Sequence, residues 1–137
     1  MNILVVNGPN LNLLGRRDPQ QYGTRSMEQI ILGVQHAHPD IYFTYRQSNH
    51  EGDLIDWLQE TQADAVILNA GGYTHTSVSL RDAVELCNAP VIEVHLSDIK
   101  KREEFRRISL LTDVCATSII GQDCYEKAVE YIIDTLH

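Results

Sequence analysis

The chain has 137 residues, which is enough for one domain with a hydrophobic core, and a composition of 43% hydrophobic and 22% charged residues excludes a disordered or fibrous protein. It carries 11 basic and 19 acidic residues. The net charge of −8 argues against a nucleic-acid partner, because phosphate binding needs an excess of Lys and Arg. No apolar run approaches the ~18 residues of a membrane span and the first residues do not read as a leader sequence, so we expect no membrane partner.

Short apolar runs, typical of strands that are buried on both faces, alternate along the chain with segments of helical spacing. The first strand is expected at Met1–Val6, and the first helix begins at the capping pair Ser26 and Gln29 and runs to about His36. The later elements alternate in the same way. Strands are expected at Ile41–Tyr45, Ala65–Asn69, Val91–Leu96 and Val114–Ile120, and helices around Leu54 to Leu58, from Ser77 to Cys87, at Arg102–Arg107 and at Tyr125–Leu136.

This alternation predicts a single α/β domain, residues 1–137, with a parallel sheet and helices on both of its faces. The alternation of strands and helices is interrupted once, where about 19 irregular residues, Asn7–Arg25, separate the first strand from the first helix. A loop of that length inside a compact domain is usually functional, and we interpret it as a lid over a binding site.

The three cysteines, Cys87, Cys115 and Cys124, are odd in number, scattered and without a C-x-x-C spacing. This usage predicts reduced, mostly buried thiols and a cytoplasmic location. It gives neither a disulfide framework nor a zinc site, and the six histidines show no H-E-x-x-H pattern, so we assign no metal and no cofactor.

Polar residues follow three of the expected strands. They lie in Gly8–Asp18 with Tyr22, in Asn69–Ser77, and in Glu93–Asp98. In an open α/β sheet, ligands bind beyond the carboxyl ends of the strands, so these three connections are expected to form one site. The familiar phosphate and hydrolase signatures are absent from them: we find no G-x-G-x-x-G, no G-K-[ST] and no G-x-S-x-G.

Acid–base chemistry is the interpretation that remains. Glu93 and His95 are two residues apart on one strand, so their side chains point to the same side, where the carboxylate can orient the imidazole. The alternative is a histidine that is merely hydrogen-bonded in the core. Arg17 or Arg16 on the lid can lower the pKa of Tyr22 from its usual value of about 10 by roughly 1–3 units and make the phenol a base.

The remaining polar groups are interpreted as a cradle for an anionic ligand. The backbone N–H groups of Leu96 and Ser97 precede an expected helix and suit a carboxylate. Arg102 and Arg106 have the i, i+4 spacing of one helix face and can reach the same anion. For Lys100 and the lysine beside it we expect an ordinary solvated surface.

Taken together, these segments resemble type II 3-dehydroquinate dehydratase (type II dehydroquinase). The matching pieces keep their order over nearly the whole chain. They are Asn7–Gly15, Tyr22-Gly23, Gln47–Gly52, Asn69–Ser77 with Leu80–Asp82, Ile92–Ser97 and Arg102–Arg106. Any one of them is weak, whereas six in register are specific.

The resemblance implies a flavodoxin-like fold, a three-layer α/β/α arrangement with a five-stranded parallel sheet, in trimers that assemble into a dodecamer. It implies anti elimination of water from 3-dehydroquinate, giving 3-dehydroshikimate through an enolate, without metal or cofactor. The implied catalytic residues are Tyr22 as base, Arg17 favouring its anionic form, Asn10 holding a water on the enolate, and His95, steadied by Glu93, as acid. The implied substrate-binding residues are Asn69, His75, Leu96, Ser97 and Arg106, with Arg102 supporting the lid and Asp82 contributed by a neighbouring subunit.

Several alternatives stay open on the sequence alone. The same reaction serves aromatic amino acid biosynthesis, as part of the shikimate pathway, and quinate breakdown. A flavodoxin-like module that binds a small acid without reacting it, or an interaction scaffold, would share the fold class. The sequence departs from the family pattern at Ala70, Gly72 and Ile108, none of which is an expected catalytic residue.

Overall fold

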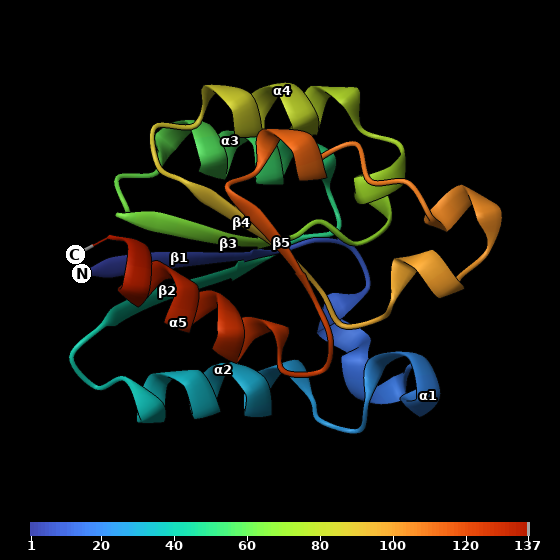
Figure 1. The fold of residues 1–137 in the computed structure, drawn as a ribbon, viewed down its shortest axis with the longest axis horizontal. Coiled ribbons are helices and arrows are strands. Elements are labelled where there is room, and N and C mark those ends of the chain that lie inside the picture. Colours follow the sequence, from blue (N-terminus) through green and yellow to red (C-terminus); the bar gives the residue numbers. More distant parts are fainter. Residues whose placement is uncertain (137) are drawn as a thin grey trace.

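A computed structural model of the chain describes residues 1–136 and contains one five-stranded parallel sheet in the order β2-β1-β3-β4-β5. Helices α2 and α5 cover one face of the sheet and α3 and α4 cover the other, so the molecule has three layers (Figure 1). The strands are β1 (Asn2–Asn7), β2 (Tyr42–Gln47), β3 (Ala65–Asn69), β4 (Val91–His95) and β5 (Thr117–Ile120), and the larger helices are α2 (Met27–Ala37), α3 (Glu51–Glu60), α4 (Val78–Leu86) and α5 (Cys124–Thr135). The predicted flavodoxin-like α/β fold is confirmed.

Alternate residues of the inner strands serve two separate cores. On β1, Ile3 and Val5 pack against α2 and α5, whereas Leu4 and Val6 pack against α3 and α4. This follows from the two-residue period of a strand, which sends successive side chains to opposite faces. Strands buried on both faces therefore need continuous apolar runs, and those runs were the sequence signal that located them.

The first long helix begins where its capping pair predicts. The backbone N–H of Gln29 donates to Ser26 Oγ at 3.1 Å, and the backbone N–H of Ser26 donates to Gln29 Oε1 at 2.9 Å. These reciprocal bonds satisfy N–H groups that have no partner within the helix. The segment expected to be irregular before it contains a 3₁₀ helix, Leu11–Arg16, and a short helix α1, Pro19–Tyr22.

The expected helix at Arg102–Arg107 is wrong. The backbone is extended at Arg102 and Glu103, and two separate 3₁₀ turns, Ile99–Lys101 and Glu104–Arg106, flank that break. The extended backbone lets Arg102 bond with Ser97 and with a side chain of the lid segment, which a continuous helix would not allow. The last strand is also shorter than expected, since Thr112–Val114 forms a 3₁₀ turn before β5.

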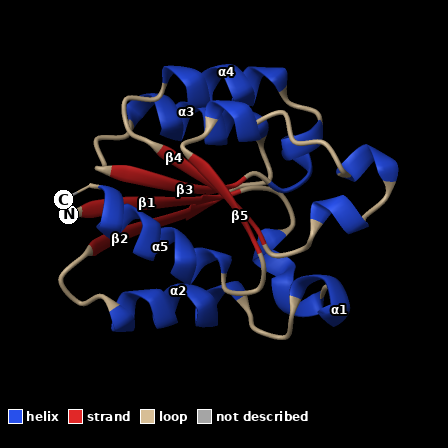
Figure 2. Cartoon of the chain, in the orientation of Figure 1, coloured by secondary structure: helices blue, strands red, loops and turns tan. Residues whose placement is uncertain are grey.

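The loops after β1 and β3 approach each other closely at the carboxyl edge of the sheet, where short helical turns gather (Figure 2). Gly8 N–H donates to the carbonyl oxygen of Asn69 at 2.7 Å, and a Cβ at Gly8 would lie 2.4 Å from the carbonyl oxygen of Ala70. Only glycine fits there. Gly71, with φ of 61°, sits against Pro9 in the same contact. The two loops are therefore held together at one edge.

Within residues 1–136, none of the helices combines the length and hydrophobicity that crossing a bilayer requires. All three cysteines carry free thiols. Burial raises the pKa of both Cys115 and Cys124 to about 12, so these two thiols stay protonated at neutral pH. They behave as small apolar side chains rather than as nucleophiles.

Candidate active site

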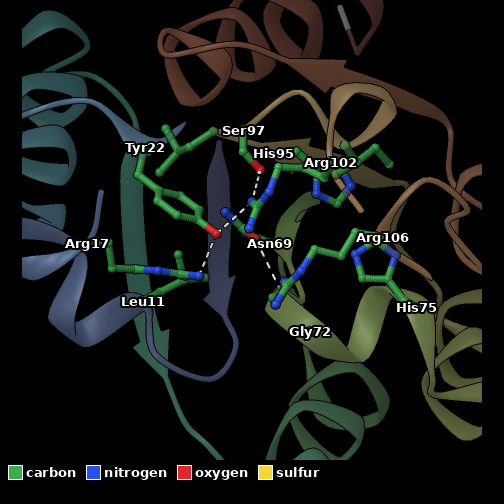
Figure 3. A pocket seen from close by; sticks show the side chains of 13 residues that line it. Leu11, Arg17, Tyr22, Asn69, Gly72, His75, His95, Ser97, Arg102 and Arg106 are labelled. Carbon is green, nitrogen blue, oxygen red and sulfur yellow. Dashed lines mark hydrogen bonds between the residues drawn. The ribbon is translucent and has the colours of Figure 1, made fainter. Parts of the chain in front are cut away.

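A cavity of about 40 Å³ opens at the carboxyl edge of the sheet, between the loops that follow β1, β3 and β4 (Figure 3). That volume holds a few water molecules. The predicted meeting of the three polar connections is confirmed, because all three contribute side chains to this cavity. The lining consists of Leu11, Arg17, Tyr22, Asn69, Gly71, Gly72, His75, His95, Leu96, Ser97, Ile99, Arg102 and Arg106.

Two guanidinium groups converge on the phenol oxygen of Tyr22, at the end of α1. Arg17 Nη2 donates to Tyr22 Oη at 2.5 Å, and Arg102 Nη1 donates to the same oxygen at 2.8 Å. The Arg17 guanidinium carbon also lies 3.7 Å from the centre of the phenol ring. Both donors are charged, so the phenol oxygen accepts two charge-assisted hydrogen bonds. This arrangement also settles the open choice between the two lid arginines in favour of Arg17.

Glu93 and His95 form the expected pair on β4. His95 Nε2 lies 2.8 Å from Glu93 Oε2, and the two residues are only 5% and 1% exposed. Since a carboxylate can only accept, the proton of this bond belongs to Nε2 of the ring. Nδ1 is then the nitrogen of His95 that remains for a ligand.

Glu93 is ionised despite its burial. Burial opposes the charge, but hydrogen bonds from His95, Ser109 and Thr112, together with the attraction of the His95 imidazole, outweigh it and lower the pKa of Glu93 to about 2. Ser109 Oγ donates to Oε2 at 2.5 Å, and Thr112 Oγ1 donates to Oε1 at 2.6 Å. Both oxygens of the carboxylate are thus satisfied inside the fold.

The β3 side of the cavity is also fixed by hydrogen bonds. Asn69 Nδ2 donates to Tyr125 Oη at 3.1 Å, and Tyr125 Oη donates to Asn7 Oδ1 at 2.7 Å, so a buried chain of three side chains holds Asn69. His75 Nδ1 lies 2.7 Å from the carbonyl oxygen of Ile108, which can only accept. His75 therefore presents Nε2 as its free nitrogen.

The cavity lining is basic in a chain of net charge −8. Three arginines and two histidines line it, and no Asp or Glu is among the thirteen lining residues. Such a lining suits a ligand that carries a carboxylate. Arg102 and Arg106 both reach the cavity as expected, although Arg102 does so from the extended break and Arg106 from the following 3₁₀ turn rather than from one helix face. Glu103 lies between them, 3.0 Å from Arg106 Nε.

The structure gathers nine of the twelve predicted site residues in the cavity lining, with Glu93 buried directly behind His95, and leaves two away from the site. Asn10 is exposed, in a left-handed conformation with φ of 69°, and does not line the cavity. Asp82 is exposed on α4 and is likewise not part of the lining of its own chain's cavity. The roles expected for these two residues therefore remain predictions. Sequence reasoning missed the bond from Arg102 to Tyr22 and the residues that hold Glu93 and Asn69, which have no local signature.

Among residues 1–136, no group of three or more His, Cys, Asp or Glu side chains is placed to hold a metal ion. The chemistry that the cavity offers from its own side chains is proton transfer. A phenol between two guanidiniums faces the same small volume as an imidazole bonded to a carboxylate. One group suits a base and the other an acid.

Comparisons with known proteins agree with this geometry. The family described as "Dehydroquinase class II" matches residues 1–133. A "3-dehydroquinate dehydratase" from Exiguobacterium is 52% identical over 123 residues, covering 88% of this chain and 85% of its own length, and "3-dehydroquinate dehydratase 2" of Pseudomonas putida is 42% identical over 141 residues, covering 98% and 94%. The crystal structure of a type II dehydroquinase from Butyrivibrio crossotus superposes with a TM-score of 0.92 at 40% identity, covering 97% of both chains.

Proposed function

This chain belongs to the class II dehydroquinase family, whose reaction is the dehydration of 3-dehydroquinate in the shikimate pathway, and we propose that Tyr22 and His95 carry out the two proton transfers of that reaction. The chain is thus an enzyme, a hydro-lyase. The observation that supports these roles is that Tyr22, with its two guanidinium donors, lines the same cavity as the Glu93–His95 pair. None of the comparisons favours a non-catalytic binding module or a scaffold.

In the proposed mechanism, the phenolate oxygen of Tyr22 takes the proton from the carbon next to the ketone of 3-dehydroquinate. The electron pair of that C–H bond moves to give an enolate. Arg17 and Arg102 stabilise the phenolate before the transfer, because they donate to its oxygen at 2.5 and 2.8 Å. The role of Asn10, holding a water against the enolate oxygen, requires the lid segment to bring its side chain toward the cavity.

His95 completes the elimination from the other side of the cavity. The enolate collapses, the bond to the hydroxyl breaks, and the protonated imidazole gives its Nδ1 proton to the departing oxygen, which leaves as water. Glu93 stabilises the imidazolium beforehand and holds Nε2, so that Nδ1 is the donor. The product is the conjugated 3-dehydroshikimate.

Substrate binding is assigned to the basic and amide groups of the lining. Arg106 and the backbone of Leu96 and Ser97 are proposed for the carboxylate, and Asn69 and His75 for ring hydroxyls. The residues expected to form the lid, Asn7–Arg25, supply Leu11, Arg17 and Tyr22 to the cavity wall. We propose that this segment opens to admit the substrate and closes again around it.

The decisive assay mixes the purified protein with 3-dehydroquinate and follows the ultraviolet absorbance of the conjugated product. We expect turnover that EDTA leaves unchanged, since the proposed acid and base belong to the chain itself. Tyr22→Phe should bind substrate in a calorimetric titration but lose roughly a hundred- to ten-thousand-fold in kcat. Normal turnover of Tyr22→Phe would reject this residue as the base.

We also propose that the chain forms a homo-oligomer, a dodecamer built from trimers, in which Asp82 reaches the cavity of a neighbouring subunit. Asp82 is exposed on α4, where Val78 and Leu86 are 60% and 77% exposed as well, so this helix offers apolar area for an interface. Light scattering after gel filtration measures the assembly. Co-expression of Asp82→Asn with Tyr22→Phe should restore activity to some sites if Asp82 acts between subunits, and should restore none if it acts within its own chain.

A cytoplasmic location fits the free thiols of Cys87, Cys115 and Cys124 and is likewise proposed. Fractionation of cells with an antibody to the protein measures it. Recovery in a membrane or secreted fraction would contradict this part of the proposal.

A further inference from the structure

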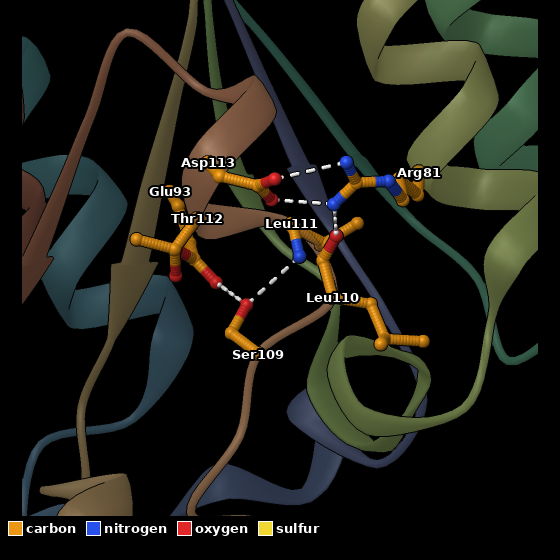
Figure 4. A network of polar contacts seen from close by, with 7 residues as sticks. All are labelled: Arg81, Glu93, Ser109, Leu110, Leu111, Thr112 and Asp113. Atoms are coloured by element: carbon orange, nitrogen blue, oxygen red, sulfur yellow. Dashed lines mark hydrogen bonds and ion pairs between the residues drawn. The ribbon is translucent and has the colours of Figure 1, made fainter.

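A short segment outside the cavity, Ser109–Asp113, makes polar contacts that end on the carboxylate of Glu93 (Figure 4). Resting on the proposed function, we propose that Ser109 and Thr112 are positioning residues for the dehydration: through Glu93 they fix the orientation and the tautomer of His95, and Arg81 anchors the segment that carries them. Neither hydroxyl belongs to a residue that lines the cavity.

The first step of the argument concerns the two oxygens of Glu93. Oε2 accepts from His95 Nε2 and from Ser109 Oγ, and Oε1 accepts from Thr112 Oγ1. A buried carboxylate with fewer donors would pick up a proton, and a protonated Glu93 could no longer hold the proton of His95 on Nε2. The two hydroxyls thus decide whether the imidazole has a fixed partner.

The second step concerns the direction of the Ser109 bond. Ser109 Oγ accepts the backbone N–H of Leu111 at 3.0 Å, so the oxygen is held in place and its single proton is free to point at Glu93. Leu111 is fully buried in the core beneath α3 and α4. The hydroxyl is therefore oriented by the core of the protein and not by solvent.

The third step is the anchor provided by Arg81 on α4. Its guanidinium donates to the carbonyl oxygen of Leu110 at 2.8 Å and forms two bonds with the carboxylate of Asp113, one of them 2.9 Å long (Figure 4). The N–H of Leu110 donates in turn to the carbonyl oxygen of Thr74 at 2.9 Å. Paired, planar contacts of this kind hold a backbone segment in one register.

The same segment also reaches the second histidine of the cavity. The carbonyl oxygen of Ile108, next to Ser109, accepts from His75 Nδ1. Residues 108–112, which follow the 3₁₀ turn Glu104–Arg106, therefore hold a ring nitrogen of His75 directly and, through Glu93, a ring nitrogen of His95. Displacement of this stretch would release both rings together.

Few charges other than His95 act on Glu93. Cys115, on the segment leading into β5, also faces this carboxylate; burial, followed by the charges of Glu93 and Asp113, raises the pKa of its thiol to about 12, so it stays neutral. Arg81 and Asp113 neutralise each other on the outer side of the segment. After His95 itself, Ser109 and Thr112 are therefore the groups that keep Glu93 ionised.

The first test compares Thr112→Val, which removes the hydroxyl at nearly constant volume, with Thr112→Ser, which keeps it. We expect Thr112→Val and Ser109→Ala to lower kcat about ten-fold with KM within about two-fold, and to narrow the pH profile of kcat on its acidic side. Thr112→Ser should retain most of the wild-type rate. A control of the same substitution type, Thr61→Val, removes a hydroxyl away from the cavity that accepts the backbone N–H of Ala63, and it should leave both parameters unchanged.

The second test needs no turnover. Nitrogen NMR of the His95 ring in the substrate-free protein should show a proton held on Nε2 by the bond to Glu93 in the wild type, and weaker or exchanging Nε2 protonation in Thr112→Val and Ser109→Ala. Wild-type ring spectra together with wild-type pH profiles in both variants would overturn the proposal. A wild-type protein that folds but does not dehydrate 3-dehydroquinate would reject the proposed function instead, and the NMR comparison would still decide the positioning role.

Discussion

The two sides of the cavity are built in different ways. The β4 side presents His95 from a buried strand paired with neighbours on both edges, and every polar atom of Glu93 behind it is hydrogen-bonded. The lid side presents Tyr22 from the four-residue helix α1, in which no residue is buried, and holds its oxygen through Arg17 and Arg102. The proposed acid is thus fixed by the core, whereas the proposed base is held by side chains of a less buried segment.

This difference matches what each group has to do. An acid that must keep one tautomer benefits from a rigid frame, and the cost of burying Glu93 is offset by three donors. A base that must let the substrate in and out cannot be built into the core. Leu11 and Leu14 are buried and anchor the near end of the lid segment, whereas α1 contacts the core only through the half-buried Tyr22.

The largest expected effect comes from removing His95 or Tyr22, and these two variants should differ in folding stability as well as in kcat. Both His95→Ala and Tyr22→Phe should lose roughly a hundred-fold or more in kcat. Only His95→Ala should also lose about 1–3 kcal/mol of unfolding free energy, because it removes one of the three donors to the buried Glu93 carboxylate. Urea denaturation measures this, and equal stability losses in the two variants would contradict the contrast.

Next in size is the response of the core side to acid. The pKa of Glu93 is about 2 in the folded protein, against about 4.5 for an ordinary glutamate, which corresponds to roughly 3 kcal/mol. Because the folded-state pKa is the lower one, this stabilisation is complete above about pH 4.5 and is lost as the pH falls toward 2. Glu93→Gln should flatten the fall of unfolding free energy over that range, and an unchanged slope would argue against an ionised Glu93.

A smaller effect on kcat is expected from single arginine variants on the lid side of the cavity, where the guanidinium groups of Arg17 and Arg102 both donate to Tyr22. Arg17→Lys and Arg102→Lys should each lower kcat about ten-fold, because the other arginine still donates to Tyr22, and the pH at which activity reaches its plateau should rise. Arg16→Lys, an exposed neighbour that does not line the cavity, is the matched control. Steady-state kinetics across pH distinguishes these variants, and a shift in the control equal to that of Arg17→Lys would weaken the assignment.

The smallest effect concerns the far end of the lid. Arg25 donates to the carbonyl oxygen of Gln122 at 2.6 Å and lies 3.4 Å from Glu126, with both charged side chains more than one third exposed. Exposed pairs contribute little, so Arg25→Ala should change KM about two- to five-fold and leave the core side untouched. Stopped-flow binding measures it. A loss of kcat as large as that of Arg17→Lys would mean that the lid is anchored here rather than at Leu11 and Leu14.

The sequence was informative where local rules determine structure. Apolar runs predicted the strands, the Ser26–Gln29 pair predicted a helix start, and the i, i+2 spacing of Glu93 and His95 predicted their contact. Spacing also brought Arg17 within reach of Tyr22. Each of these depends on backbone geometry over a few residues.

It was uninformative where contacts span the fold. Ser109 and Thr112 meet Glu93 only because a 3₁₀ turn before β5 aims them inward, and Tyr125 meets Asn69 from 56 residues away. The helix predicted at Arg102–Arg107 was wrong although its charged residues have good helix propensity. The extended backbone at Arg102 places its side chain on Tyr22, and this long-range contact outweighs the local preference. The roles proposed for Asn10 and Asp82 require lid movement and assembly, which the sequence of a single chain does not determine.

The bond from Tyr125 to Asn7 joins residues 118 positions apart and, through Asn69, ties the first and third strands to the last helix. Strands β1 and β3 are synthesised before α5. A nascent chain that ends before α5 therefore contains Asn69 but lacks Tyr125, the residue that orients it. The substrate contact proposed for Asn69 therefore requires the docking of α5, a long-range event in folding. Recovery of enzyme activity during refolding would thus report completion of the whole topology. Local unfolding of α5 alone would reduce activity while the sheet is still folded.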